Sequence, residues 1–286
     1  MPSEPLIVPA NAGDVAYYAQ RRQRSEHSRQ LYAALAETAP NGAWVAKDEG
    51  TPIGIAIAHA LEDEWQLSEL FVEPGFRKQG IGAQLLAEVA RDPGDVNRSG
   101  MLDPRELGGP AFFLRRGVAV QMPIMQLAGA IPREDDLMRM AAGDYRFSTE
   151  ALDAVRDRHE LSALDRSVRG TARPLDHAYF SEHAQSVGFW LDGEFAGYAY
   201  VWASGAVGPV VGASPGYLVQ FFAYALVVLQ RTYGASWCTA LVPGTNLRIM
   251  RAALRTGLAI ESVLLFGSDN GALDLSRYVG FHELLF

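Results

Sequence analysis

The segment that most constrains this chain of 286 residues lies between Val72 and Ala83 and reads VEPGFRKQGIGA. It joins an apolar strand pattern, WQLSELFV, to residues 80–91, whose apolar side chains recur at helical spacing. Glycines let a ligand approach the backbone closely, and the amides at a helix N-terminus bind anions. Arg77 and Lys78 place two cations beside these amides. The segment therefore predicts an α/β fold that binds a pyrophosphate at this strand–helix junction.

The order of predicted elements around this junction is repeated in the second half of the chain. In the first half they are helices over 14–37, a hairpin over 43–61 with its turn at 48–50, the junction, a short strand at 100–103, a short helix at 110–116 and an edge or crossover strand at 118–129. In the second half they are helices over 152–168, 175–183 and 217–233, a hairpin around Asp192-Gly193, and a helix capped by Asn246. This repetition predicts domains at 1–131 and 145–286, joined by a charged linker at 132–144.

The strand, loop and helix resemble the signature of the GNAT superfamily of acyl-CoA-dependent N-acyltransferases, in which Arg/Gln-x-x-Gly-x-Gly/Ala separates a strand from a helix. The resemblance covers residues 1 to about 128 and implies that acetyl-CoA or another acyl-CoA is the co-substrate. It assigns the pantetheine arm to the backbone of Leu70, Phe71 and Val72, and the pyrophosphate to Arg77, Lys78, Gln79, Gly80, Ile81, Gly82 and Ala83.

The second half resembles the same family in VPGTNLRIMRAALRTGLAI, where an asparagine starts a helix that ends at a glycine. Its counterpart of the phosphate loop, GASPGYL, has no basic residue, and Ser214-Pro215 there predicts a helix N-cap followed by proline. The resemblance implies two GNAT-like α/β folds in tandem, each a mixed sheet flanked by helices, the second degenerate and without CoA. Tyr198, Tyr200 and Trp202 alternate along a strand, a pattern typical of a core that also fits the wall of a cleft.

An amine acceptor is protonated at neutral pH, so its attack on a thioester needs a base. Glu69 is the predicted base, although alternation along a strand equally allows a solvated residue on the opposite face of the sheet. Glu64 and Gln66 lie nearby, and a water relay needs no single residue. Many members of the family carry a tyrosine as proton donor in the helix matched by PAFFLRRG, but that position is Phe113 here, which has no proton to give. Two hypotheses follow: acetyl transfer from acetyl-CoA to a primary amine of a small molecule or peptide, or acyl-CoA binding without catalysis.

The formal charge of −8 and the pI near 5.3 argue against nucleic acid and anionic membranes as partners. The N-terminus has no signal-peptide pattern, and the apolar run 217–229 is shorter than the ~20 residues that cross a bilayer. A cytoplasmic protein is therefore expected. A homodimer formed through the second domain or the apolar C-terminus is compatible with the sequence, although no motif supports it.

Residues Asp95 to Glu106 fit the spacing of an EF-hand calcium loop nearly position for position. The Leu-Gly-Gly-Pro that follows would break the exit helix of such a loop, and the family resemblance requires a strand near 99–103. The histidines lack zinc-ligand spacing, and the single Cys238 lies in an apolar strand pattern that indicates burial. No metal site is predicted, and calcium stays an alternative for this loop.

Overall fold

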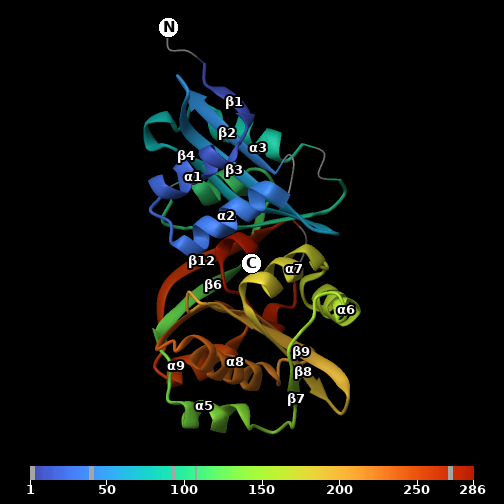
Figure 1. Ribbon diagram of the computed structural model, residues 1–286. Helices are drawn as coiled ribbons and strands as arrows, with labels where there is room; N and C mark the ends of the chain where they lie inside the picture. The colour runs from blue at the N-terminus through green and yellow to red at the C-terminus, as the bar shows by residue number, and fades with distance from the viewer. Residues whose placement is uncertain (1–3, 39–41, 92–93, 107, 270–272) are drawn as a thin grey trace. The chain divides into compact units, whose positions relative to one another are not determined.

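The computed structural model describes residues 4–38, 42–91, 94–106, 108–269 and 273–286 (Figure 1). The chain forms two compact units, residues 1–100 and 101–286. Each unit buries apolar side chains of its own.

The first unit is a mixed sheet with helices on both faces. Its elements are β1 (Leu6–Pro9), α1 (Ala12–Arg21), α2 (Glu26–Thr38), β2 (Ala43–Asp48), β3 (Thr51–Ala60), β4 (Glu64–Val72), α3 (Ile81–Val89) and β5 (Asn97–Leu102). Strands β1 to β4 are antiparallel neighbours in chain order, and β4 pairs with β5 in parallel. The predicted helix pair and the hairpin are confirmed, with Glu49 and Gly50 at positive φ in its turn.

The two faces of this sheet carry different helices. A Cβ built on Gly54 would meet Leu85 of α3 at 3.1 Å. The adjacent Ile55 lies in a pocket with Tyr17 and Tyr18 of α1. Because successive side chains of a strand point to opposite faces, α3 covers one face and α1 the other.

Strand β4 departs from its neighbours near the middle. Its register with β3 shifts by one residue at Ser68, which forms a β-bulge. Its parallel ladder with β5 ends at Leu67 and Gly100, whereas β4 continues to Val72. Residues 97–102 are extended in β5, as the family resemblance requires, and are not coiled around an ion as an EF-hand loop would be. Within the described residues of the first unit, the edge of β4 beyond the bulge has no strand beside it on the β5 side.

The second unit holds two sheets, with strand orders β12-β6-β11 and β13-β10-β9-β8-β7 among its described residues. The strands are β6 (Ala119–Ala130), β7 (Ser148–Glu150), β8 (Gln185–Leu191), β9 (Glu194–Val201), β10 (Val207–Gly212), β11 (Trp237–Pro243), β12 (Ala259–Ser268) and β13 (Tyr278–Val279). The helices are α4 (Gly109–Leu114), α5 (Glu134–Ala141), α6 (Arg158–Arg169), α7 (Pro174–His183), α8 (Leu218–Tyr233) and α9 (Leu247–Arg255). Apolar side chains of α8 form much of its core.

Strand β6 is central in its sheet, so the predicted edge or crossover strand is wrong. It pairs with β11 over residues 124–130 and with β12 over residues 119–128. The prediction rested on Pro123, because proline removes a ladder donor. The β11 ladder ends at Ile124, however, so the proline falls just outside it.

Strand β6 lies within the predicted first domain, 1–131, but it pairs with β11 and β12 of the second half of the chain. The compact units therefore divide at residue 100 and not near residue 131. The predicted linker at 132–144 contains α5, which packs against α8. Gln220 of α8 donates to the carbonyls of Ala141 and Tyr145 at 3.0 Å each. The boundary of the sequence repeat, with domains 1–131 and 145–286, is a different division and stays a prediction.

Two predicted helix starts are corrected. Helix α6 starts at Arg158 rather than 152, because the Asp153 carboxylate accepts two amide hydrogens and closes a turn before it. Helix α8 starts after Tyr217, so Ser214 is not its cap; the Tyr217 amide instead donates to the Ser214 carbonyl in a turn. Asn246 does cap α9, as predicted, because its side-chain oxygen accepts an amide hydrogen of the first turn.

Among the described residues, no helix is long and apolar enough to span a membrane. The apolar run 217–229 forms most of α8, where it is largely buried. The apolar C-terminus packs into the protein, since Leu284, Leu285 and Phe286 are all buried.

Candidate functional site

The junction between β4 and α3 consists of a short 3-10 turn (Pro74–Phe76), a loop and the start of α3. Gly80 precedes α3 in the left-handed region, with φ 87°, and Lys78 also has a positive φ, 66°. The Ala83 amide turns back to the Gly80 carbonyl at 3.0 Å. Within the described chain, the amides of residues 78–82 donate to no backbone carbonyl. This row of amides, at the positive end of the α3 dipole, is suited to an anion.

The loop contains side chains that form hydrogen bonds within the junction and one that presents its charge to solvent. Arg77 donates from Nε to the Val72 carbonyl at 2.8 Å, and its guanidinium lies 5.5 Å from the centroid of the Phe71 ring. Gln79 donates to a carbonyl of its own loop. Lys78 is exposed. Arg77 therefore stiffens the junction, and Lys78 presents its charge to solvent.

The remaining loop residues contribute their backbone. Ile81 is 2% exposed and anchors α3 in the first unit. A Cβ built on Gly82 would meet the Val72 side chain at 3.6 Å, an ordinary contact. Internal packing therefore does not require glycine at position 82, whereas close approach of a ligand to the first turn of α3 would.

The strand residues of the predicted site lie beside this loop. Leu70, Phe71 and Val72 pair with β3 along one edge. Their other edge lies beyond the last pair with β5, where an extended ligand can add itself to the sheet. The structure thus brings the three strand residues and the loop 77–83 together at one end of β4. Their roles in binding stay predictions.

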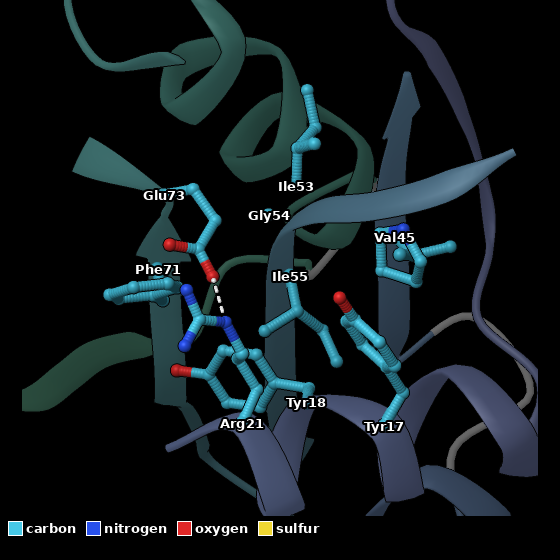
Figure 2. Close-up of a pocket in the computed structure, with 10 residues that line it drawn as sticks. Tyr17, Tyr18, Arg21, Val45, Ile53, Gly54, Ile55, Phe71 and Glu73 are labelled. Carbon is cyan, nitrogen blue, oxygen red and sulfur yellow. Dashed lines mark ion pairs between the residues drawn. The ribbon is translucent and has the colours of Figure 1, made fainter. Parts of the chain in front are cut away.

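A shallow pocket lies beside the end of β4 on the face that α1 covers (Figure 2). Its walls include Tyr17, Tyr18 and Arg21 of α1 together with Phe71 and Glu73. Arg21 Nε lies 3.3 Å from Glu73 Oε1, the ion pair drawn as a dashed line in Figure 2.

Glu69 lies on this same face and is neither solvated nor turned toward α3. Its Oε2 accepts hydrogen bonds from Arg24 at 2.9 Å and from the Tyr32 hydroxyl. Its side chain is 11% exposed. Among the described residues, none donates to its other oxygen, Oε1. The carboxylate is thus fixed through one oxygen and open at the other.

Tyr18 is a residue of this cluster that the sequence did not single out. It is 5% exposed, and its buried hydroxyl has no hydrogen-bond partner in the described part of the chain. Its ring lies 5.9 Å from that of Tyr32 and 5.4 Å from that of Phe71, centroid to centroid. Burial first, and then the charge of Glu69, raise the pKa of Tyr18 well above its ordinary value, so the hydroxyl stays protonated. Helical periodicity marked the buried face of α1 but could not show that it would meet Glu69.

The other two polar residues considered on β4 are fully buried. Glu64 is 3% exposed and accepts a hydrogen bond from Ser99 of β5. Gln66, 2% exposed, lies opposite Ser99 in the parallel ladder. Both lie where β4 and β5 are still paired, before the two strands separate. The hydrogen bond to Glu64 helps to hold the two strands together there.

Three arginines, at the end of α1 and in the turn that follows it, lie against the end of β4 and the residue after it. The contacts are Arg21 with Glu73 at 3.3 Å, Arg22 with the Phe71 ring at 4.4 Å to its centroid, and Arg24 with Glu69 at 2.9 Å. This set therefore brings three guanidinium groups and two carboxylates to the end of β4.

The second unit contains a polar cluster of its own, closed on all sides. Asp165 of α6 accepts hydrogen bonds from Arg173 at 3.2 Å and Tyr198 at 2.5 Å, and its Oδ2 lies 2.8 Å from His177 Nε2. The other ring nitrogen of His177 lies 3.0 Å from the Tyr200 hydroxyl. Every member is 2% exposed or less. Burial alone would raise the pKa of Asp165, but Arg173 and His177 lower it to about 2.

Tyr198, Tyr200 and Trp202 lie in the core of the second unit, where each is 1% exposed or less. Trp202 donates from its indole nitrogen to the Gly208 carbonyl at 2.7 Å. Of the two interpretations that the sequence left open for these aromatics, the structure therefore selects core packing. Their alternation along β9 and the residue after it is the same in either case, so the sequence could not separate the two.

The remaining residues singled out from the sequence also lie in the second unit. The junction between β10 and α8 has no basic residue. Phe113 of α4 is half-buried, with its ring 5.1 Å from that of Phe112. Cys238 is buried, and burial raises the pKa of its thiol to about 12, so the thiol is unreactive at neutral pH. The described residues contain no cluster of three or more histidine, cysteine, aspartate or glutamate side chains that could hold a metal ion.

Residues 14–101 match the sequence profile of the Acetyltransferase (GNAT) family. No curated protein matches the chain. Among solved structures, the chain is similar to a protein from Pyrococcus horikoshii assigned as an acetyltransferase, with TM-score 0.73 and 12% identity over 98% of this chain and 95% of that one. It is also similar to a tandem GNAT protein from the clavulanic acid biosynthesis pathway, with TM-score 0.61 and 16% identity over 94% and 100% of the two chains. A GCN5-related N-acetyltransferase from Sphaerobacter thermophilus gives TM-score 0.64 and 12% identity over 97% and 99%. The predicted fold, two GNAT-like folds in tandem, is confirmed.

Proposed function

We propose, from the premise that residues 14–101 form a domain of the GNAT acetyltransferase family, that this chain transfers an acetyl group from acetyl-CoA to a primary amine. The acceptor is an amine of a small molecule or a peptide. The observation that carries the proposal is the junction of residues 72–83, where a row of backbone amides and a basic side chain adjoin an open strand edge.

The residues present fit this co-substrate. A CoA thioester carries a pyrophosphate, for which the amides of residues 78–82 supply donors and Lys78 supplies charge. Its pantetheine arm is extended and carries amides, which pair with the free edge of Leu70, Phe71 and Val72. The glycine at position 82 lets the phosphates reach the first turn of α3.

In the transfer step the amine nitrogen bonds to the thioester carbonyl carbon, and the carbon–sulfur bond breaks. Glu69 takes the proton that the amine loses, through Oε1, while Tyr32 and Arg24 hold Oε2 in place. A backbone amide near Val72 donates to the carbonyl oxygen as negative charge develops on it. Phe113 donates no proton, so the thiolate takes its proton from water, and the proton held by Glu69 passes back to water to restore the carboxylate.

The second candidate function is acyl-CoA binding without catalysis. Phe113 favours it, because a family position that commonly holds a proton donor is here apolar. A transfer assay separates the two functions, since both require that acetyl-CoA bind in the first half of the chain.

Titration calorimetry of acetyl-CoA into three proteins tests the binding step. Wild type and Gly216→Trp, altered in the junction of the second half, are expected to bind equally. Gly82→Trp is expected not to bind, because the indole fills the first turn of α3. A folded wild type that does not bind acetyl-CoA contradicts both candidate functions.

Release of the CoA thiol with a panel of primary amines then tests catalysis. We expect amine-dependent release that Glu69→Gln lowers by about 10²–10⁴-fold, the usual contribution of a general base. Binding of acetyl-CoA without release in the presence of any amine would favour the non-catalytic candidate.

A further inference from the structure

The cluster around Glu69 leaves one hydrogen-bond donor and one acceptor unused. The donor is the Tyr18 hydroxyl, which is buried and, within the described chain, has no partner. The acceptor is Oε1 of Glu69, whose other oxygen already accepts two hydrogen bonds. The charge of Glu69 acts on Tyr18, yet no hydrogen bond joins the two groups. A buried hydroxyl without a partner is destabilising, so its presence requires an explanation beyond the fold.

The second unit shows what a purely structural cluster of this kind looks like. There a helix carboxylate, Asp165, bonds to Arg173, His177 and Tyr198, and the hydroxyl of Tyr200 bonds to His177. Both carboxylate oxygens and both tyrosine hydroxyls have partners, and the cluster is sealed. The cluster of the first unit also joins a carboxylate, an arginine and two tyrosines, but it leaves the Tyr18 hydroxyl and Glu69 Oε1 without partners in the described chain. This difference indicates that the first cluster is completed by a ligand.

The charge of the surroundings narrows the chemistry of that ligand. Residues 20–25, the end of α1 and the turn that follows it, carry three arginines and no acidic side chain. The residues that face them, 69–73, carry two carboxylates. The two segments together carry more arginines than carboxylates, although the chain as a whole carries −8. A spare hydroxyl donor beside arginines favours an anionic group, and a spare carboxylate oxygen favours an amine.

We propose that the acceptor is a primary amine that bears a carboxylate, in the manner of an amino acid, with its nitrogen at Glu69 Oε1 and its carboxylate on the Tyr18 hydroxyl. The inference rests on the proposed acetyl transfer and names its substrate class. Arg21 lines the same pocket as Tyr18, and its side chain is 62% exposed, so it can turn to the carboxylate without disturbing the core (Figure 2). Tyr18 is thus a specificity-determining residue, and Glu69 is the base.

The experiment measures kcat/KM for release of the CoA thiol at saturating acetyl-CoA. The acceptors are amino acids, each beside its amide and its decarboxylated amine: alanine, alaninamide and ethylamine form one such set. Rates are compared per unprotonated amine, since the three members differ in amine pKa. The proteins are wild type, Tyr18→Phe and Tyr233→Phe. The last of these removes a hydroxyl at the C-terminal end of α8, in the second unit.

Wild type is expected to prefer at least one amino acid over its decarboxylated amine by about tenfold or more, because a hydrogen bond to a charged group contributes about that factor. Tyr18→Phe is expected to lower kcat/KM for the amino acid by about tenfold through a higher KM, and to leave the decarboxylated amine unchanged. Tyr233→Phe should match wild type throughout.

Two results overturn the inference and leave acetyl transfer standing. One is a wild type whose kcat/KM for decarboxylated amines equals its kcat/KM for the corresponding amino acids. The other is a Tyr18→Phe variant that loses activity equally toward every acceptor, which is the mark of a general structural role. Release of thiol with none of the amines is instead the failure of the proposed function, and the inference falls with it.

Discussion

Replacing Tyr18 by phenylalanine should stabilise the folded protein. The variant removes only a hydroxyl that is buried and, in the described chain, makes no hydrogen bond. Leaving such a group unsatisfied costs about 1–3 kcal/mol, so removing it should raise the free energy of unfolding by about 1–2 kcal/mol. The ring and its contacts with Tyr32 and Phe71 are retained, so no cavity larger than one oxygen atom forms.

Tyr32→Phe is the matched control and should have the opposite sign. Its hydroxyl donates to the Glu69 carboxylate, and hydrogen bonds to charged groups contribute about 1.5–3 kcal/mol. Removing it should lower the free energy of unfolding by a similar amount. The two variants delete the same atom from neighbouring rings of one cluster, so their difference isolates the effect of the hydrogen-bond partner.

Urea unfolding and native-state hydrogen exchange of residues 12–21 provide the readouts. Hydrogen exchange is included because a chain with two compact units need not unfold in a single transition. A Tyr18→Phe variant as destabilised as Tyr32→Phe would refute the reasoning, because it would mean that the Tyr18 hydroxyl has a partner. A stabilised variant with lower activity toward amino acids would show a residue kept for function at the expense of stability.

The other predictions concern the second unit. Arg173→Met should destabilise it by about 3–5 kcal/mol, because the buried carboxylate of Asp165 would lose the guanidinium that pairs with it; urea unfolding measures this loss. The folded pKa of Asp165, about 2, lies below its ordinary 3.8, so about 2 kcal/mol of stability is present above that ordinary value and is lost as pH falls toward 2. Acid unfolding should show this slope in wild type and lose it in Asp165→Asn. Leu127→Ala in β6, a fully buried site, should cost about 2–5 kcal/mol and speed hydrogen exchange in α8, whereas Val120→Ala, on the exposed part of the same strand, should cost about 1 kcal/mol or less.

Local sequence was sufficient for the elements that depend on a few neighbouring residues. The run from Val72 to Ala83 predicted a strand, a glycine loop and a helix, and the structure has all three. Gly80 takes a positive φ that few other residues adopt, and the helix after it follows the spacing of its apolar side chains. The repeated order of elements likewise predicted the tandem fold. Each strand, loop and helix in these patterns is written within about twenty residues of chain.

Features that join distant parts of the chain were decided only by the tertiary structure. The position of β6 between β11 and β12 depends on partners more than a hundred residues away, and alternation along a strand does not name its neighbours. The same limit hid Tyr18, because periodicity shows that it faces inward but not that it meets Glu69. Whether a buried polar cluster closes on itself, as around Asp165, or stays open, as around Glu69, depends on the count of donors and acceptors that the fold brings together. That count exists only once the helices are packed on the sheet.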